Sequence, residues 1–327
     1  MIDNPVKQFT LKHIVIILMI IGSGLAASAQ DPQFSQFYAN PLYLNPAFAG
    51  TAYCPRIHLN YRNQWPSIPG SFVTYSASFD QYIKPISGGI GVYVMSDVAG
   101  KGSLTTNRIS AMYSYSQALS RTLSLNFALE ASFFQKSVDW NKLTFGDMID
   151  ERQGFIYTTN DVPRDGNVNK PDFSVGALLY SDLYFVGFAV HHLTQPNESL
   201  VLSESRLPIK WTIHAGANIN AGPQHDKNDI VISPNILYQI QGDFQQVNLG
   251  IYAKKGPIVF GVWYRFSDAF IMLLGLELNQ FKIGYSYDLT TSDLSTATGG
   301  AHEVSFSYRF DCKPKRRRFR TINCPSF

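Results

Sequence analysis

The chain has 327 residues and a formal net charge of +3, and only 16 % of its residues are charged, against about a quarter in ordinary soluble domains. Aromatic residues make up 14 % of the chain, yet its mean hydropathy is −0.07. This composition excludes a bundle of membrane-spanning helices and a disordered chain. It favours an all-β protein whose sheet faces two different environments.

The N-terminal 30 residues have the pattern of a secretory signal peptide. Two lysines precede an apolar run over residues 14–21, and small residues lead from there to Gln30. A glycine interrupts the run, which is too short to span a bilayer, so a cleaved signal is favoured over a single membrane anchor. We expect residues 1–30 to be removed and the exported chain to begin near Gln30 or Asp31.

Residues 31–55 are predicted to form a plug or lid for the barrel that the following residues suggest. Asn-Pro pairs at 40–41 and 45–46 restrict the backbone, and each proline lacks the N–H that a strand would donate. Five aromatic residues between positions 34 and 48 add too much apolar bulk for a free segment. Two roles stay open: packing that closes the pore, and contact with a partner.

Residues 56–310 repeatedly alternate apolar and polar side chains, which places the two kinds on opposite faces of a strand. These segments are long and carry aromatic residues near their ends, which favours a transmembrane barrel over a soluble sandwich. We predict a transmembrane antiparallel β-barrel of about 14 strands. The expected strands are residues 56–65, 71–82, 88–98, 106–117, 122–134, 171–181, 183–192, 209–220, 229–240, 245–254, 258–266, 269–279, 280–288 and 302–310.

The connections between these strands predict their orientation. The longest connections, residues 99–105, 135–170, 193–208 and 289–301, all follow odd-numbered strands. In outer-membrane barrels, long loops face the outside and short turns face the periplasm. The pattern predicts a barrel in the outer membrane of a Gram-negative cell, in contact with lipid, with both termini in the periplasm.

The polar face of the predicted strands turns to the lumen. The candidate partner contacts on this face are His58, Asn60, Arg62 and His214, whose default role is hydrogen bonding. The motifs of hydrolases, nucleotide-binding loops and zinc proteases are absent. We therefore predict no enzyme activity, no catalytic residue, no cofactor and no metal.

The three cysteines permit a disulfide, because an exported chain leaves the reducing cytosol. Cys312 and Cys324 flank a basic run and could pair with each other, or one of them could meet Cys54 across the barrel mouth. Free thiols are the alternative.

Residues 311–327 form a short basic tail with a net charge of +5. It accounts for the basic isoelectric point, so no nucleic-acid partner is expected. The tail combines cations with an apolar end, which suits docking on a periplasmic partner, contact with anionic lipid headgroups, or a strap across the barrel mouth. The residues of interest here are Arg316, Arg317, Arg318, Arg320, Ile322 and Phe327.

The opening of the mature chain resembles a known family. The residues that carry this resemblance are Phe34, Ser35, Gln36, Tyr38, Asn40, Pro41, Asn45, Pro46, Ala47 and Gly50. They are similar to the opening of the PorP/SprF family of Bacteroidetes, although two aromatic residues, at 37 and 38, stand where the family has one. The tail also looks like the ends of SprF-like members. This family is associated with type IX secretion and gliding motility.

The resemblance implies an outer-membrane barrel that helps a secreted substrate, such as a large adhesin, reach the cell surface and stay there. The expected partners are the C-terminal region of such a substrate and periplasmic secretion or gliding components. Two other functions stay open: a passive porin, suggested by the polar lumen face, and a structural link from the membrane to the periplasmic motor or peptidoglycan.

Overall fold

A computed structural model describes residues 31–150, 152, 154–159, 166–200, 204–221, 230–291 and 299–312. The expected signal peptide and the tail residues from 313 onward, including Cys324 and the arginines of the basic run, lie outside the described residues.

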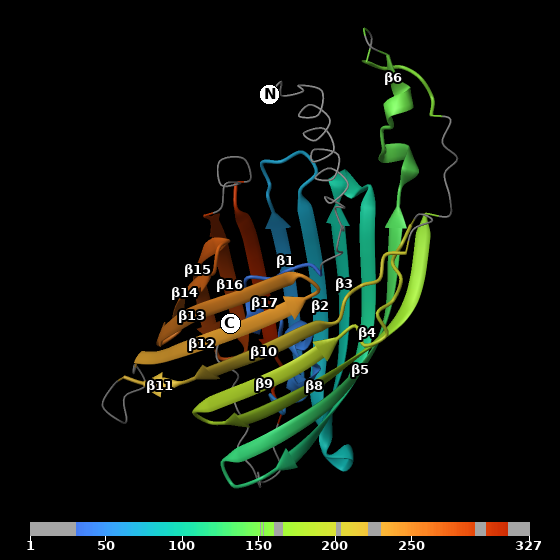
Figure 1. Ribbon diagram of the computed structural model, residues 1–327. Helices are drawn as coiled ribbons and strands as arrows, with labels where there is room; N and C mark the ends of the chain where they lie inside the picture. Colours follow the sequence, from blue (N-terminus) through green and yellow to red (C-terminus); the bar gives the residue numbers. More distant parts are fainter. Residues whose placement is uncertain are drawn as a thin grey trace, which may run out of the picture.

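Fourteen antiparallel strands close into a barrel, which confirms the predicted fold (Figure 1). Each strand pairs with its neighbours in sequence, β1 pairs with β17, and β10 pairs with β12. The barrel strands are β1 (Arg56–Gln64), β2 (Phe72–Ile83), β3 (Gly88–Ala99), β4 (Leu104–Ala118), β5 (Leu123–Val138), β8 (Asn167–Ser181), β9 (Tyr184–His191), β10 (Lys210–Ala217), β12 (Ile230–Gln241), β13 (Phe244–Lys255), β14 (Ile258–Arg265), β15 (Ala269–Leu278), β16 (Phe281–Thr290) and β17 (Ala301–Arg309).

The remaining elements are short. β11 (Ile219–Asn220) continues the pairing of β10 with β12, and β6 (Ile149–Asp150) and β7 (Gly154–Phe155) form a small hairpin between β5 and β8. The helical turns are η1 (Phe37–Ala39), α2 (Pro41–Leu44), η2 (Pro46–Phe48), η3 (Lys84–Ile86), η4 (Gly100–Gly102), η5 (Trp140–Lys142) and η6 (Gly146–Met148). None of the helical turns in the described part of the chain has the length or the hydropathy of a membrane-spanning helix.

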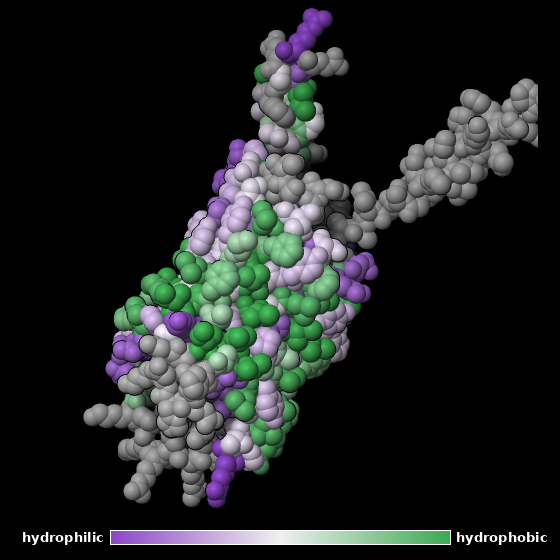
Figure 2. Space-filling view, turned by 90° about the vertical axis from the view of Figure 1, so that its left-hand side faces the viewer, coloured by the Kyte–Doolittle hydropathy of each residue, from purple (hydrophilic) through white to green (hydrophobic). Residues whose placement is uncertain are grey.

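The alternation of side chains decides which face of each strand turns outward. On β5, Phe127, Leu129 and Phe133 are exposed, whereas Asn126 and Glu130 on the other face of the strand are buried inside the barrel. Figure 2 shows that apolar side chains gather in a band over the middle of one outer face, with more hydrophilic residues towards the ends. The outer face is therefore built to contact hydrocarbon.

The two ends of the barrel differ in the length of their connections. What we call the long-loop end holds connections 65–71, 100–103, 139–166, 192–209, 242–243, 266–268 and 291–300. The short-turn end holds connections 84–87, 119–122, 182–183, 218–229, 256–257 and 279–280. β1 begins and β17 ends at the short-turn end. All four connections that the sequence marks as longest lie at the long-loop end.

Candidate functional site

The N-terminal segment, residues 31–55, runs through the lumen of the barrel (blue in Figure 1). The N–H of Asp31 donates to Gln241 at the long-loop end of β12, 3.2 Å away. Twenty residues later, Thr51 accepts a hydrogen bond from Arg56 at the start of β1. The segment thus extends from the long-loop end to the short-turn end, and from Phe34 to Thr51 every residue except Tyr43 is buried.

The Asn-Pro pairs give this segment its local shape. Pro41 begins α2 and Pro46 begins η2, where the missing N–H of proline leaves no helical hydrogen bond unmade. The side chain of Asn45 accepts a hydrogen bond from the N–H of Ala47 and caps η2. A chain of short turns results, compact enough to fit inside the barrel.

A cluster of charged groups holds the start of the segment. One carboxylate oxygen of Asp31 lies 2.8 Å from Nε2 of His192 and 3.4 Å from Nζ of Lys210, and the other lies 3.8 Å from Arg108. Burial alone would raise the pKa of Asp31, but the positive charges of His192, Lys210 and Arg108 hold this pKa well below its usual value. Asp31 is therefore an anionic anchor near the long-loop end.

This position differs from the expectation that both ends of the mature chain lie on the periplasmic side. Asp31 lies level with the long-loop ends of β9, β10 and β12, whereas Cys312 follows β17 at the short-turn end. The two ends of the described chain lie towards opposite ends of the barrel, because the cationic cluster binds Asp31 there.

A second charged cluster binds Ser35 and Gln36. The backbone N–H groups of both residues donate to the carboxylate of Glu303 on β17, at 2.6 and 3.2 Å. Arg62 on β1 lies 3.0 Å from Asp288 on β16 and 3.2 Å from Glu303, so one guanidinium joins two carboxylates. All of these side chains are buried, which ties the segment to three adjacent strands.

The two asparagines of the Asn-Pro pairs contact other strands of the barrel wall. Asn40 donates to Ser76 on β2, while Asn45 donates to the carbonyl of Ala177 on β8 and lies 3.2 Å from Nε2 of His214. Gly187 lies against this contact. A Cβ built there would overlap the His214 ring, so only glycine permits so close an approach.

The segment leaves the lumen at Gly50. Its N–H donates to Asp80, 2.8 Å away, and Asp80 also forms a buried two-point ion pair with Arg56. Gly50 has a φ of +74°, and a Cβ there would overlap the backbone of Gly89 on β3. The last residue of the motif is therefore one that only glycine can occupy without strain.

Aromatic rings fill the space between these polar anchors. Phe37 packs edge-on against Trp263, with ring centres 5.1 Å apart, and Tyr38 meets Phe185 at 5.4 Å. Phe48 stacks on the imidazole of His214. Inward residues of β9, β10 and β14 thus receive the aromatic side chains of the segment.

The predicted site residues come together in this assembly. Every residue of the opening motif is buried in the lumen, and the structure also places His58, Asn60, Arg62 and His214 inside and buried against the segment. The partners that complete the anchors were not expected from the sequence. These are Asp31, Arg56, Asp80, Arg108, Asp172, His192, Lys210, Arg265, Asp288 and Glu303.

The structure pairs Cys54 with Cys312, which corrects the suggested pairing of Cys312 with Cys324. β1 and β17 are neighbours in the barrel, with Arg56 opposite Arg309, and Phe310 donates to the carbonyl of Pro55. This register brings Cys54, two residues before β1, beside Cys312, three residues after β17, and their Cα atoms are 5.6 Å apart. The disulfide joins the exit of the N-terminal segment to the end of the sheet.

The described side chains contain no group of three or more His, Cys, Asp or Glu residues arranged to hold a metal ion. Within each charged cluster, cations and carboxylates instead neutralise one another. The clusters also bind the N-terminal segment, as Glu303 does through the N–H of Ser35. Their arrangement fastens a segment of chain inside a barrel.

A sequence model described as "Type IX secretion system membrane protein PorP/SprF" matches residues 26–308. The chain belongs to this family. The match includes the opening motif and almost the entire barrel, so it confirms the resemblance seen at residues 34–50. Family and fold together place the chain in the outer membrane as a component associated with type IX secretion. No curated protein matches the chain in sequence.

Several solved barrels have a similar outline. The outer membrane protein Omp33 of Acinetobacter baumannii is 9 % identical, with a TM-score of 0.43, over 79 % of this chain and 99 % of that one. A FadL homologue of Pseudomonas aeruginosa is 13 % identical, with a TM-score of 0.42, over 82 % and 93 %. The TodX monoaromatic hydrocarbon channel is 12 % identical, with a TM-score of 0.48, over 82 % and 94 %. Similarity at this level says nothing about function.

Proposed function

We propose that the barrel holds the C-terminal region of a type IX substrate at the cell surface, and that the substrate contacts the long-loop end rather than the lumen. The observation that supports this choice is the buried N-terminal segment, which occupies the lumen and is anchored at both of its ends. A substrate that entered the lumen would have to displace all of these contacts.

The long-loop end offers surface beyond the barrel wall. The described part of connection 139–166 projects away from the barrel at the top of Figure 1 and carries the β6–β7 hairpin. Ile149, Ile156 and Tyr157 of this connection are each at least half exposed. Large apolar side chains on a projecting loop are typical of protein contacts. In this proposal the long-loop end faces the outside of the cell and the short-turn end faces the periplasm.

The double variant Ile149→Ser, Ile156→Ser is expected to lower the affinity for the substrate's C-terminal region at least tenfold, because it removes two apolar contacts. The measurement is binding of the purified barrel to that region, together with the amount of substrate on intact cells. Ile86→Ser is the control, since Ile86 is also an exposed isoleucine but lies at the short-turn end. Equal binding by both variants would contradict the proposal.

We also propose that the N-terminal segment acts as a fixed plug, in contrast to the open channel of a passive porin. In planar bilayers the intact protein is expected to conduct weakly, while deletion of residues 32–50 raises the single-channel conductance severalfold. Polar groups now facing the segment, such as Glu303 and His214, would then line a water-filled lumen. A high conductance in the intact protein that the deletion leaves unchanged would favour the porin.

A further inference from the structure

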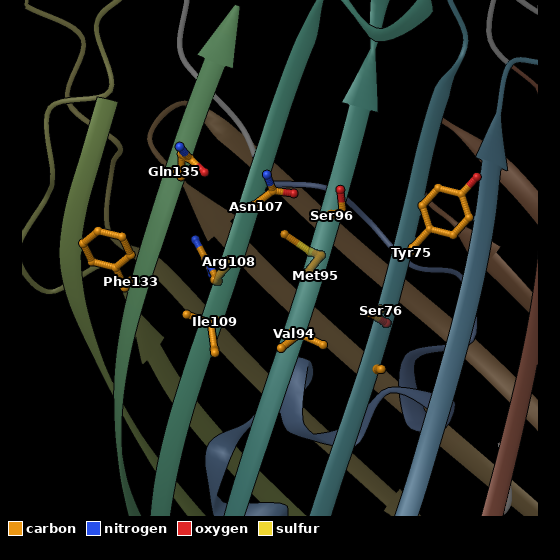
Figure 3. A pocket seen from close by; sticks show the side chains of 11 residues that line it. Tyr75, Ser76, Val94, Met95, Ser96, Asn107, Arg108, Ile109, Phe133 and Gln135 are labelled. Atoms are coloured by element: carbon orange, nitrogen blue, oxygen red, sulfur yellow. The ribbon is translucent and has the colours of Figure 1, made fainter. Parts of the chain in front are cut away.

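A groove of about 500 Å³ lies on the outer wall of the barrel, across β2, β3, β4 and β5. Figure 3 shows it from close by, with Phe133 and Tyr75 at its two sides. Small side chains, Ala77 and Ser96, lie between these large ones and leave the depression. Its volume falls within the range of roughly 300–1,000 Å³ that is usual for ligand sites.

The strand register aligns the groove's outward side chains in two rows. The row nearer the long-loop end, which we call the polar row, contains Tyr75, Ser96, Asn107 and Gln135. The row nearer the short-turn end, which we call the apolar row, contains Ala77, Val94, Ile109 and Phe133. The groove therefore straddles a change from apolar to polar side chains.

This change marks an edge of the membrane-facing band. On β5, every outward residue from Leu125 to Phe133 is apolar, and the next outward residue is Gln135. Beside Gln135, the polar row continues into Asn169 on β8. Residues 136–138 of β5 and 167–168 of β8 extend the wall farther towards the long-loop end. On β4, β5 and β8 the groove thus lies where hydrocarbon gives way to the interface, whereas on β2 and β3 the next outward residues are Val73 and Val98.

The polar row carries hydroxyl and amide groups but no outward charge. The one charged residue among those that line the groove is Arg108, whose side chain turns inward to Asp31. Among the described residues, no side chain hydrogen-bonds to that of Ser96, Asn107 or Gln135. These neutral groups can donate to carbonyl oxygens, whereas no outward cation among the lining residues would form an ion pair with a phosphate.

We propose that the groove binds one membrane lipid, with an acyl chain along the apolar row and its ester or amide linkage against the polar row. The amphipathic surface and the level of the groove match the two parts of such a lipid. Because no lining residue presents an outward cation, the groove would recognise the lipid by its ester or amide linkage and not by its phosphate headgroup.

The test measures retention of one lipid by the intact barrel in detergent, using native mass spectrometry. The probes are dioleoyl phosphatidylcholine and its ether-linked analogue, which has the same headgroup but no carbonyl groups. The intact protein is expected to retain the ester lipid several times more strongly than the ether lipid. Asn107→Leu should abolish this preference while leaving retention of the ether lipid unchanged.

Ala77→Phe fills the groove and is expected to weaken retention of both lipids about tenfold. Ala215→Phe is the matched control, because Ala215 is a half-buried outward alanine on β10, away from the groove. Heat-modifiable mobility on gels verifies that each variant is folded. Retention that Ala77→Phe leaves unchanged, or an intact protein that binds ester and ether lipids equally, would overturn the proposal. A change in oligomeric state on Ala77→Phe, with lipid retention unchanged, would assign the groove to a second copy of the chain.

Discussion

Replacing Arg62 by alanine is expected to lower the free energy of unfolding of the barrel by about 3–5 kcal/mol. The guanidinium lies between Asp288 and Glu303, at 3.0 and 3.2 Å, and all three side chains are almost completely buried. Its removal leaves two carboxylates close together with too little positive charge. Arg265 also contacts Asp288, at 3.5 Å, but no contact of Arg265 with Glu303 occurs among the described residues.

The measurement is urea unfolding of the barrel in lipid vesicles, followed by tryptophan fluorescence. Lys84→Ala, which removes an exposed cation from η3, is the control and is expected to change stability by less than about 0.5 kcal/mol. The triple variant Arg62→Met, Asp288→Asn, Glu303→Gln removes all three charges together and should recover much of the loss. A loss below about 1 kcal/mol for Arg62→Ala would show that water reaches the cluster and screens these charges.

The number and order of the strands could be predicted from the sequence because side-chain alternation is a local signal. It is clearest where one face of a strand meets hydrocarbon, as from Leu125 to Phe133. Where the strands extend beyond the membrane band, both faces meet water or polar loops. There the alternation ends, so the prediction ended β5 at residue 134 and began β8 at residue 171, four residues short in each case.

The contacts that hold the N-terminal segment could not be predicted in the same way. Arg62, Asp288 and Glu303 lie on three strands that are far apart in sequence, and only barrel closure brings β1 beside β17. Closure also explains why Cys312 pairs with Cys54, although Cys324 is nearer to it in sequence. A usable signal was present, because each of these charged residues occupies an inward position, where an isolated charge would be costly.

His191 and His192 illustrate a local limit of the alternation rule. Adjacent residues of a regular strand face opposite sides, so alternation alone would point these two rings apart. His192 instead has a φ of +61° and lies just beyond the end of β9. Both side chains are buried, and His192 bridges Asp31 and Asp172. A backbone conformation set by tertiary contacts thus overrode the pattern at an anchor of the N-terminal segment.

The inward position of Asn126 also changes what substitutions on β5 should do. From alternation alone, an arginine on the inner face would be tolerated better than one on the outer face. The structure shows Asn126 completely buried, with its amide donating to the carbonyl of Ala47, 3.1 Å away. An arginine there would displace the N-terminal segment. The stability costs of inward and outward arginines on β5 therefore have different causes and do not isolate the effect of the membrane.

Arginine substitutions at two depths on the outer face test the position of the membrane more directly. Leu129 lies in the middle of the apolar run of β5 and is 66 % exposed, so Leu129→Arg is expected to cost about 2–4 kcal/mol in lipid vesicles. Asn169→Arg, in line with the polar row on β8, should cost about 0–1 kcal/mol, because an arginine at the interface keeps its charge in water.

Urea unfolding in vesicles measures both variants, and Leu129→Ala separates the lost apolar contact from the added charge. In detergent micelles, which adapt to a charged side chain, the difference between the two arginine variants should shrink. An equal cost for both in vesicles would place the row of Asn169, and with it Ser96, Asn107 and Gln135, inside the hydrocarbon. No ester linkage would reach the groove at that depth, so the same measurement also tests the level on which lipid recognition depends.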